Sequence, residues 1–274
     1  MNTVPFFKMS GSGNDFIIID NRSHMVNEDQ LIEFVTRICR RKMSVGSDGF
    51  ILLEDTEGAD FKWRFYNSDG SAAEMCGNGA RCVARFAYLN GIAGTDMSFE
   101  TEAGIVHAEV RNERVKINLP DPADLQMDYA IELKNGSRSV CSINTGVPHV
   151  VVPTDNLADA DVVALGREIR FHSQYSPAGT NVNFIRSLDG DGIAIRTYER
   201  GVEDETLACG TGAVASAIVS AVKFGKHSPV DVLTQSGGHL NIYFDEKEGT
   251  FRDIFLEGDA RVIYKGELWE DAWK

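Results

Sequence analysis

The segment Cys76-Gly77-Asn78-Gly79-Ala80 decides the fold, because it recurs 133 positions later as Cys209-Gly210-Thr211-Gly212-Ala213. The same shift aligns three further separated pairs: Gly13 with Gly146, Gly46 with Gly179, and Phe65 with Tyr198. A single glycine match arises by chance, but one offset holds for four separated blocks. Self-similarity at a fixed period indicates a repeated structural unit. We therefore interpret the chain as two copies of one α/β unit.

The local pattern of each copy runs from strand to loop to Cys-Gly-x-Gly to helix. Short β-branched or aromatic runs bounded by turn residues predict strands at 16–19, 50–53, 61–66, 105–119, 150–152, 192–198 and 241–244. Apolar periodicity predicts helices at 28–41, 79–89, 156–170 and 212–224. The segment 120–128, with two prolines and several acids, is the best candidate for a boundary.

These patterns predict an α/β (α+β) fold of two pseudo-symmetric domains, each a sheet wrapped on a central helix. We expect residues 1–118 to form the N-terminal half and 119–263 the C-terminal half. Residues 264–274 are expected to pack back on the first half, and the active site is expected at the interface of the halves.

Both repeated cysteines are expected at helix N-termini. The positive end of the helix dipole and its unpaired N–H groups favour an anion there. The same setting lowers the pKa of a thiol and makes thiolate available near neutral pH. The glycines that follow allow close approach of the backbone where each helix begins.

Two equivalent acid/base groups suit the inversion of a stereocentre. One group removes a proton from one face of a carbon while the other delivers a proton to the opposite face. The helix N-termini could bind a carboxylate and stabilise the charge of the developing carbanion. Cys76 and Cys209 are therefore the predicted catalytic pair of a cofactor-independent isomerase.

Composition excludes several other classes. The net charge of −14 argues against nonspecific binding to nucleic acid or to an anionic membrane, since both require a positive field. No apolar run reaches the ~18–20 residues that span a membrane, and no secretory signal is evident, so we expect a cytoplasmic protein. The five cysteines lack a Cys-x-x-Cys pair, and none of the six histidines lies near a cysteine at zinc-ligand spacing, so neither disulfides nor a structural zinc are expected.

Four segments resemble the diaminopimelate epimerase family, and the likeness extends from about Lys8 to Gly266. They are Gly13-Asn14-Asp15-Phe16, Asn67-x-Asp69-Gly70-Ser71, Met75-Cys76-Gly77-Asn78-Gly79-Ala80-Arg81-Cys82, and the run from Glu199-Arg200-Gly201-Val202 to Ala208-Cys209-Gly210-Thr211-Gly212. The resemblance implies a two-domain enzyme that interconverts LL- and meso-diaminopimelate without pyridoxal phosphate, in lysine and peptidoglycan-precursor biosynthesis. We also expect a homodimer, although the residues themselves leave the oligomeric state open.

The resemblance also implies roles for individual residues. Cys76 and Cys209 match the acid/base cysteines of the family. The groups that hold the carboxylate at the reacting end match Gly77, Asn78, Gly210 and Thr211. Substrate-contacting positions match Asn14, Asn67, Asn181, Glu199 and Arg200, and His149 matches a histidine near the site. Two departures bear on substrate recognition: Val147 stands where the family often has Asn, and Gly49 where some members have Gln.

Structural interpretations compete with some of these assignments. We expect Cys39, Cys82 and Cys141 to be ordinary small core residues, with Cys39 in a helix and Cys141 at a strand start. Arg81 is expected to form a structural ion pair. Arg200 is interpreted as a substrate ligand rather than a surface partner of Glu203 or Asp204, and for His149 both an accessory and a buried structural role stay open.

Alternative functions also remain. A histidine, proline or hydroxyproline racemase would use the same two cysteines but would have no second carboxylate to bind. A thiol-redox or thiol-sensing protein would leave the glycines and the polar residues unexplained. A non-catalytic amino-acid binder would have no use for two thiols.

Overall fold

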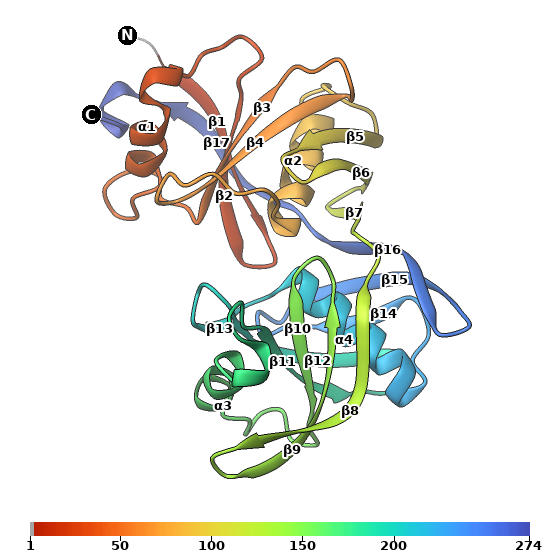
Figure 1. Cartoon of the computed structure of the whole chain (residues 1–274). Coiled ribbons are helices and arrows are strands. Elements are labelled where there is room, and N and C mark those ends of the chain that lie inside the picture. Colours follow the sequence, from red (N-terminus) through yellow and green to blue (C-terminus); the bar gives the residue numbers. More distant parts are fainter. Residues whose placement is uncertain (1–2) are drawn as a thin grey trace. The chain divides into compact units, whose positions relative to one another are not determined.

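The computed structural model describes residues 3–274, which divide into two compact units (Figure 1). Unit 1 contains the chain up to Ile117 together with Gly258–Lys274, and unit 2 contains Asn118–Glu257. The expected halves ended at residues 118 and 263. The second boundary lies earlier in the structure because one long strand, β16 (Thr250–Asp259), runs from unit 2 into unit 1.

Unit 1 holds eight strands and two α-helices among the described residues. The strands are β1 (Val4–Gly11), β2 (Asn14–Asp20), β3 (Gly49–Glu54), β4 (Phe61–Asn67), β5 (Asp96–Thr101), β6 (Gly104–Arg111), β7 (Arg114–Asn118) and β17 (Arg261–Leu268). The helices are α1 (Leu31–Ile38) and α2 (Gly77–Leu89), with short 3-10 turns at Glu28–Gln30 and Glu270–Ala272.

Unit 2 contains the remaining elements. Its strands are β8 (Ala123–Leu133), β9 (Gly136–Asn144), β10 (Pro148–Pro153), β11 (Asn181–Ser187), β12 (Gly192–Glu199), β13 (Asp204–Thr206), β14 (Val230–Leu233), β15 (His239–Lys247) and most of β16. Its helices are α3 (Val162–Arg170) and α4 (Gly210–Phe224), with a 3-10 turn at Ser173–Tyr175.

The two units share one topology. In unit 1, β1–β2 is antiparallel, β2–β3 parallel, β3–β4 antiparallel, β4–β5 parallel and β5–β6 antiparallel. In unit 2 the same alternation runs through β9, β10, β11, β12, β14 and β15. The outer strand also repeats, since β17 pairs with β1 as β8 pairs with β9. The repeat in the sequence is thus a repeat of the fold, and the predicted α/β class is confirmed.

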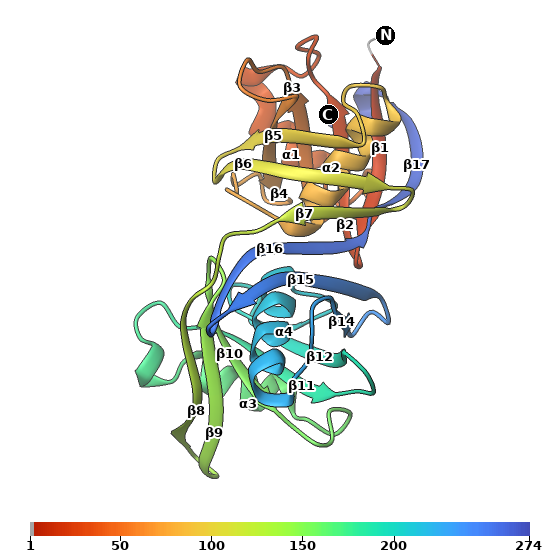
Figure 2. The same cartoon turned by 90° about the vertical axis from the view of Figure 1, so that its right-hand side faces the viewer.

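Each sheet is covered on both faces, which explains its continuous apolar strands. Ile17 and Ile19 of β2 pack in one cluster with Val35 and Ile38 of α1. On the other face, the start of α2 approaches Phe16, with α2 lying along β1, β2, β3 and β6. In unit 2, α3 packs against one face of the sheet, and α4 lies along the strands from β9 to β15 (Figure 2). Strands buried on both faces lose the polar alternation of a half-exposed sheet.

The structure corrects several predicted element boundaries. The helix expected over 28–41 is α-helical only from Leu31 to Ile38. The helix expected from residue 156 begins at Val162, because the side chain of Asp161 accepts a hydrogen bond from the Ala164 N–H and caps it there. The single strand expected over 105–119 is two strands, separated by a turn in which Asn112 has φ 58°.

The segment expected as a boundary was placed too late in the sequence. Unit 1 already ends at Ile117, and Ala123 starts the long strand β8, which pairs with β9. The prolines and acidic residues of this segment lie at the exposed start of β8 and not in a linker between the units. The helices expected from residues 79 and 212 each begin two residues earlier, at Gly77 and Gly210.

Candidate active site

Cys76 and Cys209 each occupy the N-cap of a buried helix. Both have extended backbone, with φ −146° and −122°, and the next residue begins α2 or α4. The Cys76 carbonyl accepts the first helical hydrogen bond from Ala80 at 2.8 Å, and the Cys209 carbonyl accepts from Ala213 at 2.9 Å. The prediction of two helix N-termini is therefore confirmed. The first N–H groups of each helix have no acceptor within it and favour an anion.

Glycine at the start of α2 permits the helix to pack directly on the sheet. A Cβ atom on Gly79 would lie 3.3 Å from the side chains of Ile51 and Trp63 and 3.4 Å from Phe16. Gly79 does not have positive φ, so it is required for close approach and not for a turn. This contact fixes where Cys76 stands relative to the ends of the strands.

The predicted residues of unit 1 meet at one edge of its sheet. Asn14 begins β2 and Asn67 ends β4, with β3 between them in register through the pairs Phe16–Gly49 and Gly49–Asn67. Cys76 Sγ lies 3.7 Å from Asn14 Oδ1. The structure therefore brings Asn14, Asn67 and the Cys76 helix end to the same edge.

Asn67 is held by the turn that follows its strand. Its Nδ2 donates to Ser71 Oγ at 3.0 Å, and its backbone N–H donates to the Ser71 carbonyl at 2.9 Å. The Asp69 carboxylate in turn accepts from the N–H and the hydroxyl of Ser71, at 2.8 and 2.6 Å. The Asn-x-Asp-Gly-Ser motif is thus a self-bonded turn that orients the Asn67 amide.

A charged network that the sequence analysis left unassigned supports Asn14. Asn14 Nδ2 donates to Asp48 Oδ2 at 2.8 Å, and Arg41 pairs with both Asp15 and Asp48, at 2.6 and 2.8 Å. Lys8 pairs with Asp15 at 2.8 Å. Burial would raise the pKa of Asp15, but the hydrogen bonds from Arg41 and Lys8 outweigh it and lower that pKa to about 2. The only sequence signal for this network was Asp15 inside the Gly13–Phe16 motif.

Arg81 anchors the start of α2 from inside the protein. It is fully buried and donates to the carbonyls of Gly77 and Asp259, to Ser12 Oγ at 2.8 Å and to Asn78 Oδ1 at 3.0 Å. The expected ion pair is wrong, because these acceptors are carbonyl, hydroxyl and amide oxygens. The bond to Asn78 turns its Oδ1 toward Arg81. Gly77 and Asn78 both have backbone N–H groups in the first turn of α2, where such groups have no acceptor within the helix.

The predicted residues of unit 2 gather at the corresponding edge. Asn181 begins β11, Glu199 ends β12, and Arg200 follows directly. Asn181 Oδ1 accepts from the Arg200 N–H at 2.8 Å, and its Nδ2 donates to the Pro148 carbonyl at 3.2 Å. The Asn181 amide thus ties the Arg200 backbone to β10. Burial raises the pKa of Glu199.

Arg200 is not engaged by the acids considered as surface partners. Its Nη1 donates to the Ala178 carbonyl at 3.3 Å. Glu203 pairs instead with Arg170, at 3.1 Å, and accepts from the Tyr198 hydroxyl. The surface ion pair between Arg200 and Glu203, one of the two interpretations, is therefore not formed.

The start of α4 carries Cys209, Gly210 and Thr211. Cys209 Sγ lies 3.6 Å from Thr211 Oγ1, and the Thr211 carbonyl accepts from the buried hydroxyl of Thr145 at 3.0 Å. Thr145 lies in the loop before β10, so this bond ties the helix end to the strand edge that holds Asn181.

His149 is buried in a chain of hydrogen bonds. Its Nδ1 lies 3.0 Å from Asn183 Nδ2, and Asn183 Oδ1 accepts from Thr197 Oγ1 at 2.9 Å. The Asn183 amide nitrogen can only donate, so Nδ1 is the acceptor and Nε2 carries the proton. Burial, followed by the charge of Arg200, lowers the pKa of His149 to about 3. The ring is therefore neutral at physiological pH.

The other three cysteines are buried structural residues. Burial raises the pKa of Cys39, Cys82 and Cys141, and that of Cys82 to about 12. We predicted Cys141 at a strand start, but it lies inside β9. A raised pKa leaves little thiolate near neutral pH, so these thiols are poor acid/base catalysts.

Gly49, one of the two departures from the family pattern, has a steric explanation. A Cβ atom at Gly49 would lie 2.6 Å from a ring carbon of Phe65 and 3.1 Å from Phe16. The Phe65 ring therefore occupies the space into which a longer side chain would project.

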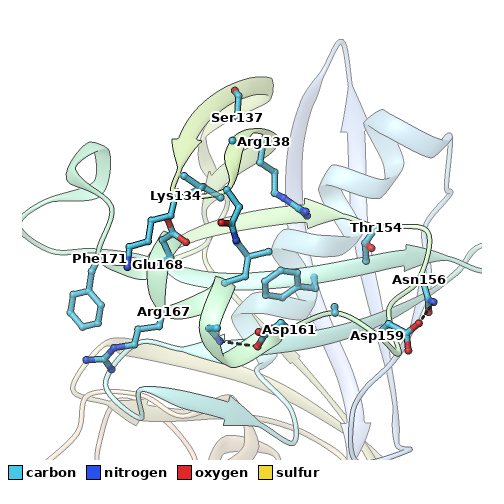
Figure 3. A pocket seen from close by; sticks show the side chains of 17 residues that line it. Lys134, Ser137, Arg138, Thr154, Asn156, Asp159, Asp161, Arg167, Glu168 and Phe171 are labelled. Carbon is cyan, nitrogen blue, oxygen red and sulfur yellow. Dashed lines mark hydrogen bonds between the residues drawn. The ribbon is translucent and has the colours of Figure 1, made fainter.

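A cavity of about 1060 Å³ in unit 2 lies apart from these residues (Figure 3). It is bounded by the turn between β8 and β9, the loop after β10, and α3, with charged side chains such as Arg138, Arg167 and Glu168 in its lining. None of the candidate catalytic or substrate-binding residues lines it. Across residues 3–274, no helix is long and apolar enough to cross a membrane.

Solved structures share this fold. The phenazine biosynthesis protein of the PhzF family from Bacillus anthracis matches with a TM-score of 0.72 at 16% identity, over 98% of this chain and 100% of the other. A probable proline racemase from Agrobacterium radiobacter matches with a TM-score of 0.69 at 18% identity, over 97% of this chain and 93% of the other. The fold is thus that of these two solved structures, and in this chain each of its two repeats has a cysteine at the N-cap of a helix.

Sequence comparison gives the family within that fold class. The family model for diaminopimelate epimerase matches residues 6–123 and 141–263. The diaminopimelate epimerase of Aquifex aeolicus is 46% identical over 98% of this chain and 99% of its own length. The chain belongs to the diaminopimelate epimerase family and is an isomerase.

Proposed function

We propose that this chain interconverts LL- and meso-diaminopimelate without a cofactor, with Cys76 and Cys209 as its acid/base pair. The observation that carries the proposal is the placement of one cysteine at the N-cap of the central helix in each repeat, in a chain of this family. The other three cysteines lie in cores where burial raises the thiol pKa.

The reaction needs one thiolate and one thiol at a time. The thiolate takes the α-hydrogen as a proton from one face, and the thiol gives its proton to the opposite face of the carbanion. After one turnover the two sulfurs have exchanged protonation states, and the atoms of substrate and enzyme balance. Backbone N–H groups at Gly77, Asn78, Gly210 and Thr211 are the groups we assign to the carboxylate of the reacting centre, where negative charge accumulates.

The unreacting end of the substrate also carries a carboxylate and an ammonium group. We assign the carboxylate to the Arg200 guanidinium, which can bind it through two parallel hydrogen bonds. Asn14 and Asn67 supply directional amides, and Glu199 supplies a carboxylate for the ammonium group. Asn181 acts through Arg200, because both ends of its amide are bonded to backbone.

Proton exchange measured by NMR in deuterated water tests this function. Incubation with diaminopimelate should replace the hydrogen at one α-carbon with deuterium and interconvert the LL and meso isomers. Proline, hydroxyproline and histidine should not exchange, since they lack the second carboxylate that Arg200 would bind. Exchange of one of these amino acids instead would identify a different racemase, and exchange of none would favour a thiol-redox protein or a binder.

A cytoplasmic location and a homodimer remain predictions. The first is supported by a biosynthetic substrate and by reactive thiols, which stay reduced in the cytosol. Light scattering coupled to size-exclusion chromatography tests the second: a mass near twice the 30.1 kDa of the chain is expected.

A further inference from the structure

The orientation of the Asn14 side chain is fixed by Asp48. The Nδ2 atom of Asn14 lies 2.8 Å from Asp48 Oδ2. A carboxylate paired with Arg41 only accepts hydrogen bonds, so the group facing it must be the amide NH2. The amide oxygen therefore points the other way, to Cys76, whose sulfur lies 3.7 Å from it.

This orientation distinguishes between the two protonation states of Cys76. An amide oxygen accepts a hydrogen bond from S–H but repels a thiolate, whereas an amide NH2 would do the opposite. With its oxygen toward the sulfur, Asn14 stabilises the thiol.

Asp48 is itself held on several sides. Its Oδ2 also accepts from the Asp15 N–H at 3.1 Å, and its own N–H donates to Asp15 Oδ1 at 2.9 Å. Arg41 binds both carboxylates, and Lys8 pairs with the other oxygen of Asp15. The carboxylate cannot turn without breaking these contacts, so the Asn14 amide cannot turn either.

Groups on α2 act on Cys76 in the other direction or are neutral. Arg81 on α2 interacts electrostatically with Cys76 as a positive charge, and the helix N-terminus is partly positive, so both favour a thiolate. Cys82, also on α2, is uncharged near neutral pH because burial raises its pKa to about 12. Since Cys209 has the same kind of helix end, the dipole does not distinguish the two cysteines, but Asn14 does.

The position that corresponds to Asn14 in the second repeat carries no amide. The residue 133 positions after Asn14 is Val147, whose side chain has no polar group. Cys209 lies instead 3.6 Å from the Thr211 hydroxyl, which can rotate to donate to a thiolate. The two settings, equivalent in backbone, differ in side-chain chemistry.

We propose that Asp48 is a positioning residue which, by orienting Asn14, keeps Cys76 as the thiol and Cys209 as the thiolate in the substrate-free enzyme. The catalytic meaning of this asymmetry rests on the proposed function. In the resting state Cys209 would then be ready as the base and Cys76 as the acid, and the opposite direction of reaction would first require exchange of a proton.

The test is the pH dependence of alkylation by iodoacetamide, followed for each cysteine separately by peptide mass spectrometry. In the unmodified protein at neutral pH, Cys209 should react faster than Cys76. In Asp48→Asn, the carboxylate that only accepts hydrogen bonds is replaced by an amide that can also donate to Asn14 Oδ1, so the Asn14 amide can turn its NH2 toward Cys76. The Cys76 alkylation rate below its titration midpoint should then rise about three- to tenfold, the size of one net hydrogen bond. The Cys209 profile should not change.

Asp20→Asn is the matched control. Asp20 pairs with Arg22 at the other end of β2, about 20 Å along the strand from Asn14. The variant removes the same charge from the same unit and should leave the Cys76 profile unchanged. Asn14→Ala is a second variant: it removes the acceptor for S–H and should also shift Cys76 reactivity to lower pH.

Two results would overturn the proposal. One is a Cys76 profile that is the same in folded Asp48→Asn and Asn14→Ala as in the unmodified protein. The other is faster alkylation of Cys76 than of Cys209 in the unmodified protein. Since alkylation needs no substrate, the assay stays informative if diaminopimelate is not turned over, and failure of the proposed function is thereby separated from failure of this inference.

Discussion

Gly212, at the start of α4, lies directly against the side-chain amide of Asn183 on β11: a Cβ atom on this glycine would stand 2.3 Å from Asn183 Oδ1. Asn183 in turn bonds His149 and Thr197. The helix that carries Cys209 is thus seated on a buried hydrogen-bonded chain, and only a residue without a side chain fits the contact.

Substitution of this glycine should therefore damage the site more than a helix substitution normally would. Gly212→Ala must displace Asn183 or lift α4, at a cost of about 1–3 kcal/mol of unfolding free energy, typical of overpacking. We also expect lower turnover, because Cys209 moves with the helix. Urea unfolding and steady-state kinetics measure both. The control is Gly94→Ala, where the nearest atom to a new Cβ is 3.7 Å away. Equal behaviour of the two variants would contradict the argument.

Each of the two N-cap cysteines should be indispensable. Cys76→Ala and Cys209→Ala should each lower epimerisation by at least the ~10²–10⁴-fold typical of general acid–base catalysis, with the fold intact. Cys39→Ala and Cys141→Ala are the controls and should retain turnover. Interconversion of the isomers is followed by chromatography, and circular dichroism checks folding. Near-normal turnover in either N-cap variant would exclude the two-base scheme.

Arg200 should determine recognition of the second carboxylate. Arg200→Ala leaves that group without its counter-charge, a loss of roughly 2–5 kcal/mol for a desolvated pair. The matching decrease in kcat/KM is about 30- to several-thousand-fold. The measurement is steady-state efficiency on the LL and meso isomers. Arg252→Ala, an exposed arginine of unit 2, controls for the loss of charge. A decrease of less than threefold for Arg200→Ala would refute the assignment of the second carboxylate to this residue.

Neutral His149 should make stability depend on pH in a defined window. Its pKa in the folded state, about 3, lies below the ordinary 6.5, so unfolding takes up a proton between those values. Stability is thus full above about pH 6.5 and falls as the pH decreases through the window. At pH 5 the loss should be about 2 kcal/mol relative to His149→Gln, which cannot titrate. Urea unfolding at pH 5 and pH 7.5 measures it, and parallel pH dependence of the two proteins would contradict a buried neutral ring.

The sequence by itself determined the repeat, the α/β class and the cysteines at helix N-termini. These features are local: Cys-Gly-x-Gly before an apolar run specifies a cap and a helix, and a fixed offset exposes duplication without knowledge of any contact. Element boundaries were predicted less accurately. The helix expected from residue 156 starts at Val162, because Asp161 caps it there, although the apolar periodicity extends into the preceding segment.

Only the tertiary structure decided which partners the site residues have. Asp48 and Asn14 are 34 positions apart, and Arg81 meets the Asp259 carbonyl 178 positions away, so no spacing pattern links them. The sequence predicted an ion pair for Arg81, but its guanidinium donates to carbonyl, hydroxyl and amide oxygens. Hydrogen-bond partners of buried polar groups depend on which strands are adjacent and where they end, and strand pairing is a property of the folded chain.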